Sequence, residues 1–545
     1  MISLKQKVLI IIMTSVLTLG AISIVNADTV KTRISGGWRN DTTATLISQA
    51  GWTQSDTVII VSGSDFPDAL CAGPLAKKLN APILMTGSYA SCYLGSATLT
   101  EIERLNATKA IIIGGTGVIS DSIKEELGNA GVSAERIGGA DRYETSVLIA
   151  QKLDKSPSIV VTSGDNFPDA LSISSIAAQQ GMPIILSSKN GLFPEAESYI
   201  SSNEITKTYI VGGTGALDGS IESEVPNPTR LAGKDRYETN LAVLNQFRSN
   251  LKFNKVYIAT GNDFSDALVG SVLAAKTQSP VILVDTDLTD SLAKYIVENK
   301  TSSTNVIVIG NLRNVNDRVF DEAQGVAVDR QPLTTDLMAD EIIDEVIKPG
   351  MSDFEKELAL HDYIIENATY NYGDNGLHSV GDTDPSDTAE SVLLKGEGGD
   401  NGVTEAMNLL LDKVGIESQI VTGRIKDGVV WRDDYKWSMV KINGDYYQLD
   451  VYSDLTNTNG SFDVTPDHTY FNVTDEFLSN DHSWSSSYPK CTVKYELSEQ
   501  PKVENNSTET DNNAENNDGN KTNEPTYYPS DPSDNTPGMT IPPSL

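Results

Sequence analysis

The chain repeats one set of sequence blocks three times, and this repetition limits the folds that it can adopt. The block RIGGADRYET at Arg136 recurs as RLAGKDRYET at Arg230 and, in degenerate form, as RISGGWRNDT at Arg33. Two more blocks follow each copy in the same order. They are FPDAL at Phe66, FPDAL at Phe167 and FSDAL at Phe264, then IIIGGTG at Ile111, YIVGGTG at Tyr209 and the weaker VIVIG at Val306. Ordered blocks at a period of roughly 100 residues indicate three copies of one structural unit.

Each copy alternates short apolar runs with helical patterns. The runs at 57–61, 158–161 and 255–259 are continuous, whereas 145–153 places apolar residues at helical spacing. Continuous apolar strands that alternate with helices are typical of a parallel sheet covered on both faces. The sequence therefore predicts three small α/β modules, at residues 28–132, 133–228 and 229–325.

Two motifs inside the repeats have both a functional and a structural interpretation. The Gly-Gly-Thr-Gly turns follow apolar strands, as phosphate-binding loops do, but the full GxGxxG spacing and a Walker Lys-Ser/Thr pair are absent. Glycines that supply a positive φ are therefore the favoured interpretation. The aspartates of the second block precede an Ala-Leu helix start, so we expect helix caps before functional acids. They are Asp68, Asp169 and Asp266.

One arginine of the first block aligns in all three copies, as Arg39, Arg142 and Arg236. It persists in the first copy although that copy has lost the neighbouring Asp and Tyr. A guanidinium fork suits the phosphate or carboxylate groups of a polymer. A structural salt bridge would use the same side chain, and both interpretations stay open at this stage.

The blocks Arg-x-x-Gly-x-Asp-Arg-Tyr-x-Thr and Phe-Pro-Asp-Ala-Leu, in three tandem copies, resemble the cell wall binding repeat 2 family of Gram-positive surface proteins over residues 33–325. The resemblance implies a pseudo-threefold assembly within one chain, and hence a monomer. It also implies that the assembly holds an anionic cell wall polymer or peptidoglycan noncovalently. The first copy departs from the pattern at Trp38 and Asn40, which puts its share of any polymer site in doubt.

The first residues are typical of a secretion signal. Lys5 and Lys7 precede an apolar run at 8–25, and small residues stand at the cleavage position near Ala27. An uncleaved membrane anchor is the alternative, because the run is almost long enough to span a bilayer. We expect residues 1–27 to be a signal peptide, and a secreted protein without membrane contact after cleavage.

The charge of the chain restricts its partners. With 75 acidic and 41 basic residues, the net charge of -34 repels phosphate backbones, so nucleic acid is an unsuitable partner. Residues 499–545 are rich in Asn, Pro and acids and are expected to be a disordered tail. This tail lacks a covalent wall-sorting signal, so we expect noncovalent attachment at the cell wall or cell surface.

A fourth domain of a different type is predicted at residues 333–498. Helical spacing is expected at 342–347, 354–364 and 404–414, and strands at 419–422, 436–442 and 446–451. Asn443-Gly444 is a strong hairpin turn between the last two strands. Helices followed by a hairpin sheet indicate an α+β domain.

This segment resembles the transglutaminase-like superfamily, which has a papain-like core. The matching stretches are LDKVGIES from Leu411, WSMVKING from Trp437, QLDV from Gln448 and YFNVTD from Tyr470. The resemblance places the nucleophilic Cys at Asp400, the His at Tyr435 and the third triad member at Asp450. Only Asp450 keeps the residue type of the family.

Acyl transfer through a thioester needs a thiolate that is activated by a nearby base. The three cysteines of the chain are Cys71, Cys92 and Cys491, and none lies between 333 and 490. A carboxylate at Asp400 is a weaker nucleophile, and a phenol at Tyr435 is a poor base at neutral pH. We therefore expect a lost active site. The alternative is an acyltransferase or a cysteine-protease-like enzyme with an unorthodox site.

The remaining candidate sites have structural explanations. His361, His378, His468 and His482 lack metal-ligand spacing, so no metal site is expected, and no motif indicates a cofactor. Acids at Asp382, Asp384 and Asp387 do not follow the spacing of a calcium loop. Cys71 and Cys92 are a plausible disulfide in an oxidising environment.

Aromatic residues near the triad positions suggest a different use of the same cleft. Tyr435 and Trp437 would suit a sugar or peptide strand of the cell wall if their rings lined the cleft. Core packing of both residues is the alternative.

Overall fold

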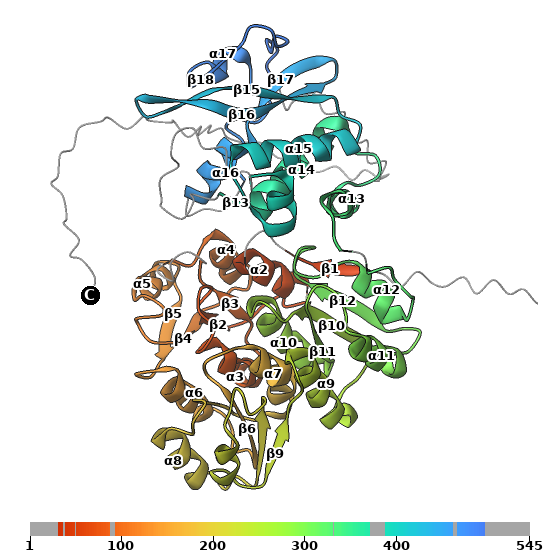
Figure 1. Ribbon diagram of the computed structural model, residues 1–545. Helices are drawn as coiled ribbons and strands as arrows, with labels where there is room; N and C mark the ends of the chain where they lie inside the picture. The colour runs from red at the N-terminus through yellow and green to blue at the C-terminus, as the bar shows by residue number, and fades with distance from the viewer. Residues whose placement is uncertain are drawn as a thin grey trace, which may run out of the picture. The chain divides into compact units, whose positions relative to one another are not determined.

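The structure of this chain is a computed structural model that describes residues 31–35, 39–49, 51–87, 93–330, 332–370, 387–460 and 466–495 (Figure 1). The expected signal peptide and acidic tail lie outside these residues, as do Trp38, Cys92, His378, Asp382 and Asp384. Within the described ranges, no helix is both long and apolar enough to span a membrane.

Three four-stranded parallel sheets form the repeat region, and this confirms the predicted α/β modules. The first has the order β3 (Ile83–Met85), β2 (Thr57–Val61), β4 (Lys109–Ile113), β5 (Ser133–Ile137). The second has the order β7 (Ile184–Ser187), β6 (Ser158–Ser163), β8 (Lys207–Val211), β9 (Pro228–Leu231). The third has the order β11 (Val281–Val284), β10 (Lys255–Thr260), β12 (Asn305–Ile309), β1 (Thr32–Ile34).

The edge strand of each sheet comes from the next sequence copy. Strand β5 lies within the second copy but completes the first sheet, and β9 lies at the start of the third copy but completes the second sheet. The third sheet takes its edge strand from the first copy, because β1 pairs with β12 with Arg33 opposite Val308. The three copies are therefore joined into a closed circuit of shared strands.

The helices that follow the second block pack against one another at the centre of the repeat region (Figure 1). They are α3 (Ala72–Leu79), α7 (Pro168–Gln180) and α10 (Ser265–Thr277). The phenylalanine that opens each block meets its two counterparts, with ring centroids 5.3, 6.1 and 6.3 Å apart. These phenylalanines are Phe66, Phe167 and Phe264. Three equivalent rings in mutual contact mark the pseudo-threefold arrangement that the repeats predicted.

The other helices of the repeat region flank these sheets. They are α2 (Arg39–Gln49), α4 (Ser96–Arg104), α5 (Ser122–Asn129), α6 (Arg142–Ala150), α8 (Pro194–Ser202), α9 (Arg236–Gln246), α11 (Asp290–Asn299) and α12 (Arg318–Gln324). Helix α6 packs on β7 and α9 packs on β11. The Asp of the first block is the N-cap of each of these two helices. Asp141 and Asp235 accept hydrogen bonds from backbone N–H groups of the first turn.

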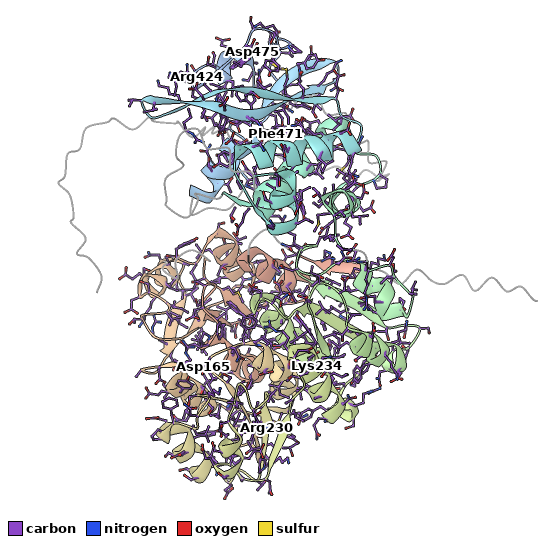
Figure 2. The ribbon with its side chains drawn as sticks, in the orientation of Figure 1. Asp165, Arg230, Lys234, Arg424, Phe471 and Asp475 are labelled. Atoms are coloured by element: carbon purple, nitrogen blue, oxygen red, sulfur yellow. The ribbon has the colours of Figure 1, made fainter. Side chains whose placement is uncertain are left out.

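The first arginine of each block fixes a glycine turn of the adjacent sheet strand. Its Nη1 donates to the carbonyl oxygen of that glycine in the pairs Arg33 with Gly310 (2.6 Å), Arg136 with Gly114 (2.8 Å) and Arg230 with Gly212 (2.9 Å). Figure 2 labels Arg230. The three glycines have φ values of 108°, 121° and 128°, which only glycine adopts readily. The turn interpretation of these glycines therefore agrees with the backbone.

The aspartates of the second block do not act as side-chain helix caps, which corrects the sequence expectation. Asp68 makes no capping hydrogen bond, and Asp169 and Asp266 lie inside the first turn of their helices. Each carboxylate instead lies against the turn glycine. A Cβ on that glycine would stand 2.5 to 2.8 Å from Oδ2 in the pairs Asp68 with Gly114, Asp169 with Gly212 and Asp266 with Gly310.

Two of these carboxylates, Asp68 and Asp169, face the first block of the next copy. Burial raises the pKa of Asp68, while a hydrogen bond from Thr145 and the charge of Arg142 lower it. Burial likewise raises the pKa of Asp169, while Thr239 and Arg236 lower it. The second block of one copy therefore meets the first block of the next copy, which supplies the donor and the positive charge that a buried carboxylate needs.

The fourth domain has its own hydrophobic core and an antiparallel sheet. The sheet has the order β17 (Asp445–Leu449), β16 (Val430–Ile442), β15 (Ser418–Asp427), β18 (His482–Trp484), and β13 (Thr369–Tyr370) pairs separately with β14 (Glu397–Gly398). The helices are α13 (Thr335–Val346), α14 (Asp353–Asn367), α15 (Asp400–Lys413), α16 (Val451–Gly460), α17 (Asp475–Leu478) and a π-helical turn, Ser391–Lys395.

The predicted hairpin joins β16 to β17. Asn443 and Gly444 both have positive φ, at 54° and 96°, as a two-residue turn requires. Helix α15 packs on β15 and β16, and both Leu410 of the helix and Trp437 of β16 are fully buried. An α+β domain with a central helix against a sheet is thereby confirmed.

Candidate functional site

The three positions assigned to the degenerate triad lie at the junction of α15, β16 and β17. Asp400 is the first residue of α15, and its Oδ2 accepts a hydrogen bond of 2.9 Å from the backbone N–H of Lys436. Tyr435, on β16, donates its hydroxyl to Asp450 at 3.1 Å from Oδ1 and 2.9 Å from Oδ2. The fold thus places all three positions in one region of the fourth domain.

Asp450 is fully buried and accepts from several donors at once. Besides Tyr435, its partners are the backbone N–H and the hydroxyl of Ser453, at 3.1 and 2.6 Å, and His482 Nε2 at 3.0 Å. A buried carboxylate is stabilised only when such donors replace water. Asp450 therefore serves as the centre of a structural hydrogen-bond network.

His482 belongs to this network although sequence spacing gave no sign of it. The residue lies on β18, where it stands opposite Ile425 of β15. Its Nδ1 lies 2.7 Å from Asp481 Oδ1, so both ring nitrogens contact a carboxylate. Burial lowers the pKa of His482, but Asp450 and Asp481 outweigh that effect and raise its pKa above the usual value. A raised pKa reduces the share of the neutral imidazole, which is the form that a general base requires.

Tyr435 is a hydrogen-bond donor and not a base. Burial, followed by the charges of Asp450 and Asp400, raises the pKa of its phenol well above 10. Its side chain is only 2% exposed. The hydroxyl consequently stays protonated at any physiological pH.

The two aromatic candidates for a binding cleft are core residues in this structure. Trp437 is 0% exposed, donates from Nε1 to Gln448 Oε1 at 2.7 Å and packs against Trp484 and His482. Tyr435 is buried beside it. Neither ring presents a face to a ligand, and core packing explains both.

Asp400 lies in an unusual electrostatic environment. The pKa of this carboxyl is raised to about 6, because burial and the nearby charge of Asp387 raise it by more than the hydrogen bond from Lys436 lowers it. Arg432 Nη2 stands 4.0 Å from Asp400 Oδ1, and its positive charge lowers the pKa of Asp400. A neutral fraction of Asp400 is therefore present close to neutral pH.

Asp387 occupies the N-terminus of the same helix. Its Oδ1 accepts from the backbone N–H groups of Gly399 (2.7 Å) and Gly402 (2.9 Å), and its Oδ2 accepts from Asn401 (3.2 Å). A helix N-terminus attracts negative charge and lowers the pKa of a thiol placed there. In this protein the N-terminus of α15 holds the carboxylates of Asp387 and Asp400 in place of a thiol.

The described cysteines are not placed for nucleophilic catalysis. Cys71 lies in the repeat region, and burial raises the pKa of its thiol well above the usual value. Burial and the charge of Asp475 raise the pKa of Cys491 to about 12. A thiolate is the reactive form, so both thiols are inert at neutral pH. The proposed disulfide partner of Cys71 lies outside the described residues.

The aligned arginines of the repeat region are partly engaged by their own chain. Arg142 Nη1 donates to the carbonyl oxygen of Gly164 at 2.7 Å, and Arg236 Nη1 donates to that of Gly261. Both guanidinium groups also act on the buried aspartate of the preceding copy. Arg39 begins α2, and its side chain lies outside the described part of the structure.

Comparison with known proteins defines both parts of the chain. The model of the cell wall binding domain 2 (CWB2) family matches residues 33–124, 136–222 and 230–320. The model of the transglutaminase-like superfamily matches residues 340–451. The three modules are CWB2 repeats, and the fourth domain belongs to the transglutaminase-like superfamily.

Relatives match the repeat region. N-acetylmuramoyl-L-alanine amidase LytC of Bacillus subtilis (strain 168) is 32% identical over 293 residues, which cover 54% of this chain and 58% of LytC. The amidase enhancer of the same organism is 34% identical over 273 residues, which cover 50% of this chain and 37% of the enhancer. The structure of Cwp6 from Clostridium difficile is 31% identical, with a TM-score of 0.50, over 55% of this chain and 48% of Cwp6. The chain thus spans only part of each relative.

Replacement of Asp400 by Asn should stabilise the fourth domain at neutral pH. The folded-state pKa of about 6 exceeds the usual value of 3.8 for an aspartate, so the ionised carboxylate costs stability above pH 6 and the cost disappears below pH 4. We expect Asp400→Asn to gain about 1 to 3 kcal/mol at pH 7.5 and almost nothing at pH 3.5. Calorimetry of the full chain would measure the fourth-domain transition. Asp412→Asn, exposed on the same helix, controls for loss of a charge, and a gain independent of pH would contradict the assignment.

Proposed function

We propose that the three CWB2 repeats hold this protein noncovalently at a cell wall by binding anionic wall polymer, and that they display a fourth domain without acyl-transfer activity. The family of the repeats supports attachment to the wall. One relative is named an N-acetylmuramoyl-L-alanine amidase and another an amidase enhancer, which suits the same location. The expected signal peptide would deliver the chain there.

An acidic protein that binds an acidic polymer needs local positive charge or a bridging cation. The net charge is -34, so the overall field is repulsive. Arg142 and Arg236 are half-buried at equivalent places, and each known contact to a glycine carbonyl uses the nitrogen Nη1. A guanidinium group has five donors, so the remaining edge of each fork suits a phosphate or carboxylate of the polymer.

The carboxylates at the N-terminus of α15 are the observation that carries the proposal of a non-catalytic domain. Asp400 stands at the nucleophile position, and Asp387 takes up three backbone N–H groups beside it. Tyr435 stands at the base position but keeps its proton. Acyl transfer requires a nucleophile and a base in contact, and these positions supply neither.

An unorthodox acyltransferase or cysteine-protease-like enzyme remains the alternative function. One observation favours it, because the pKa of about 6 at Asp400 lies in the range of a general acid or base. The carboxylate of Asp400, however, accepts a hydrogen bond from the backbone N–H of Lys436 and lies close to the buried phenol of Tyr435. We therefore assign the raised pKa to burial and not to catalysis.

Wall attachment predicts that the purified full chain sediments with cell walls and is released when anionic polymer is stripped from them. Equal retention by stripped walls would contradict the polymer assignment. The double variant Arg142→Ala and Arg236→Ala should lose at least half of its retention and become less sensitive to salt. Arg104→Ala, which removes an arginine outside the repeated blocks, is the matched control. Circular dichroism would verify folding, and a folded double variant that binds like the unmodified chain would leave these arginines with a structural role only.

The non-catalytic assignment predicts that the full chain incorporates no amine into glutamine peptides and hydrolyses none of them. The assay would follow a fluorescent amine donor at pH 5 and pH 8, which lie on either side of the pKa of about 6 at Asp400. Turnover that is abolished by Asp400→Ala, but not by Asp412→Ala on the same helix, would establish the alternative function.

A further inference from the structure

A second cluster of polar residues lies in the fourth domain, away from the triad positions in sequence. His361 and Asp362 are neighbours on α14, and His468 follows α16 in the chain. Asp362 Oδ1 lies 2.9 Å from His361 Nδ1 and 2.7 Å from His468 Nε2. Sequence spacing predicted no metal-ligand set, but the fold brings these three residues together.

The three side chains offer ligand atoms that converge. One nitrogen of each imidazole and a carboxylate oxygen all lie within 4.8 Å of one another. Ligand atoms around a tetrahedral zinc ion stand roughly 3.3 Å apart, so small side-chain movements bring this set into position. Two imidazoles and one carboxylate are a donor set that favours first-row divalent metals over Mg²⁺ or Ca²⁺.

Neighbouring residues fix the orientation of the first imidazole. His361 is fully buried, and its other nitrogen, Nε2, lies 3.2 Å from Asp454 Oδ2. Asp454 is itself held by the backbone N–H of Tyr470, which donates to Oδ1 at 2.9 Å. A carboxylate on the far nitrogen is the usual support of a metal-binding histidine, because it fixes the ring and increases its basicity.

Aromatic packing fixes the second imidazole relative to the first. The rings of His361 and His468 are stacked, with centroids 5.1 Å apart. Phe471, labelled in Figure 2, packs its ring at right angles to both, at 4.8 and 5.8 Å. The outer side of the cluster is open, since the side chains of Asp362 and His468 are 30% and 41% exposed. An ion therefore has a path from solvent.

We propose that His361, Asp362 and His468 form a binding site for Zn²⁺ or a similar first-row divalent cation, with a fourth coordination position open to solvent. The bound ion would connect α14 to the segment after α16. Three protein ligands and one open position are also the arrangement that accepts water or an external ligand. Asp454 acts as a positioning residue that does not touch the ion.

The full chain is first freed of metal with a chelator. Its titration with Zn²⁺, measured by isothermal titration calorimetry, then tests this site, and scanning calorimetry measures its thermal midpoint. We expect one saturable site, tenfold or more tighter than for Mg²⁺ or Ca²⁺, and an increase in the thermal midpoint of the fourth domain with Zn²⁺. His468→Ala and Asp362→Asn should each weaken binding at least tenfold. Asp454→Asn should weaken it about tenfold while one ion per chain is still bound at saturation.

Asp481→Asn is the matched control. Asp481 contacts Nδ1 of its neighbour His482, in the same way as Asp362 contacts Nδ1 of its neighbour His361. It should bind Zn²⁺ like the unmodified chain. Thermal unfolding in chelator would show that each variant is folded. Absence of a saturable site, or unchanged affinity in folded His468→Ala and Asp362→Asn, would overturn the proposal and leave the cluster as an ion-pair network.

Discussion

The repeat region depends on the pairing of β1 with β12. Each of the three sheets takes its edge strand from the next copy, so no copy completes its own sheet. For the third sheet, the required strand lies at the other end of the repeat region, and the carbonyl of Ile34 receives the N–H of Gly310. An unpaired parallel strand would expose backbone donors and apolar side chains. The three copies consequently fold as one body, and the proposed polymer sites have fixed positions relative to one another.

In both parts of the molecule, buried carboxylates need hydrogen-bond donors or positive charges in place of water. In the repeats, Asp68 and Asp169 meet the donors and the arginine of the next copy, so the repeated blocks stabilise the boundaries between copies. In the fourth domain, Asp450 is satisfied by Tyr435, Ser453 and His482. One of these donors, Tyr435, stands at the base position and keeps its proton. This reasoning connects the well-packed triad positions to the proposed absence of catalysis.

Much of the fold and part of the site could be predicted from the sequence. Strands and helices follow from local apolar patterns, and the turn at Asn443-Gly444 fixes β16 against β17, which places Tyr435 near Asp450. The exchange of edge strands could not be predicted, because no local pattern states which sheet a strand joins. Nor could the contacts of His482 and His468, which come from segments far from their partners in sequence. The buried state of Trp437 depends on the whole domain and not on its neighbours in sequence.

The circuit of shared strands closes where β1 pairs with β12, and the exchange rate of one backbone amide tests this closure most directly. The N–H of Gly310 donates to Ile34 in the first copy, as the N–H groups of Gly114 and Gly212 donate to Ile137 and Leu231. Hydrogen exchange of the full chain should show Gly310 protected to the same degree as these two internal references. Rapid exchange at Gly310, with Gly114 and Gly212 protected, would contradict the closure of the repeat region.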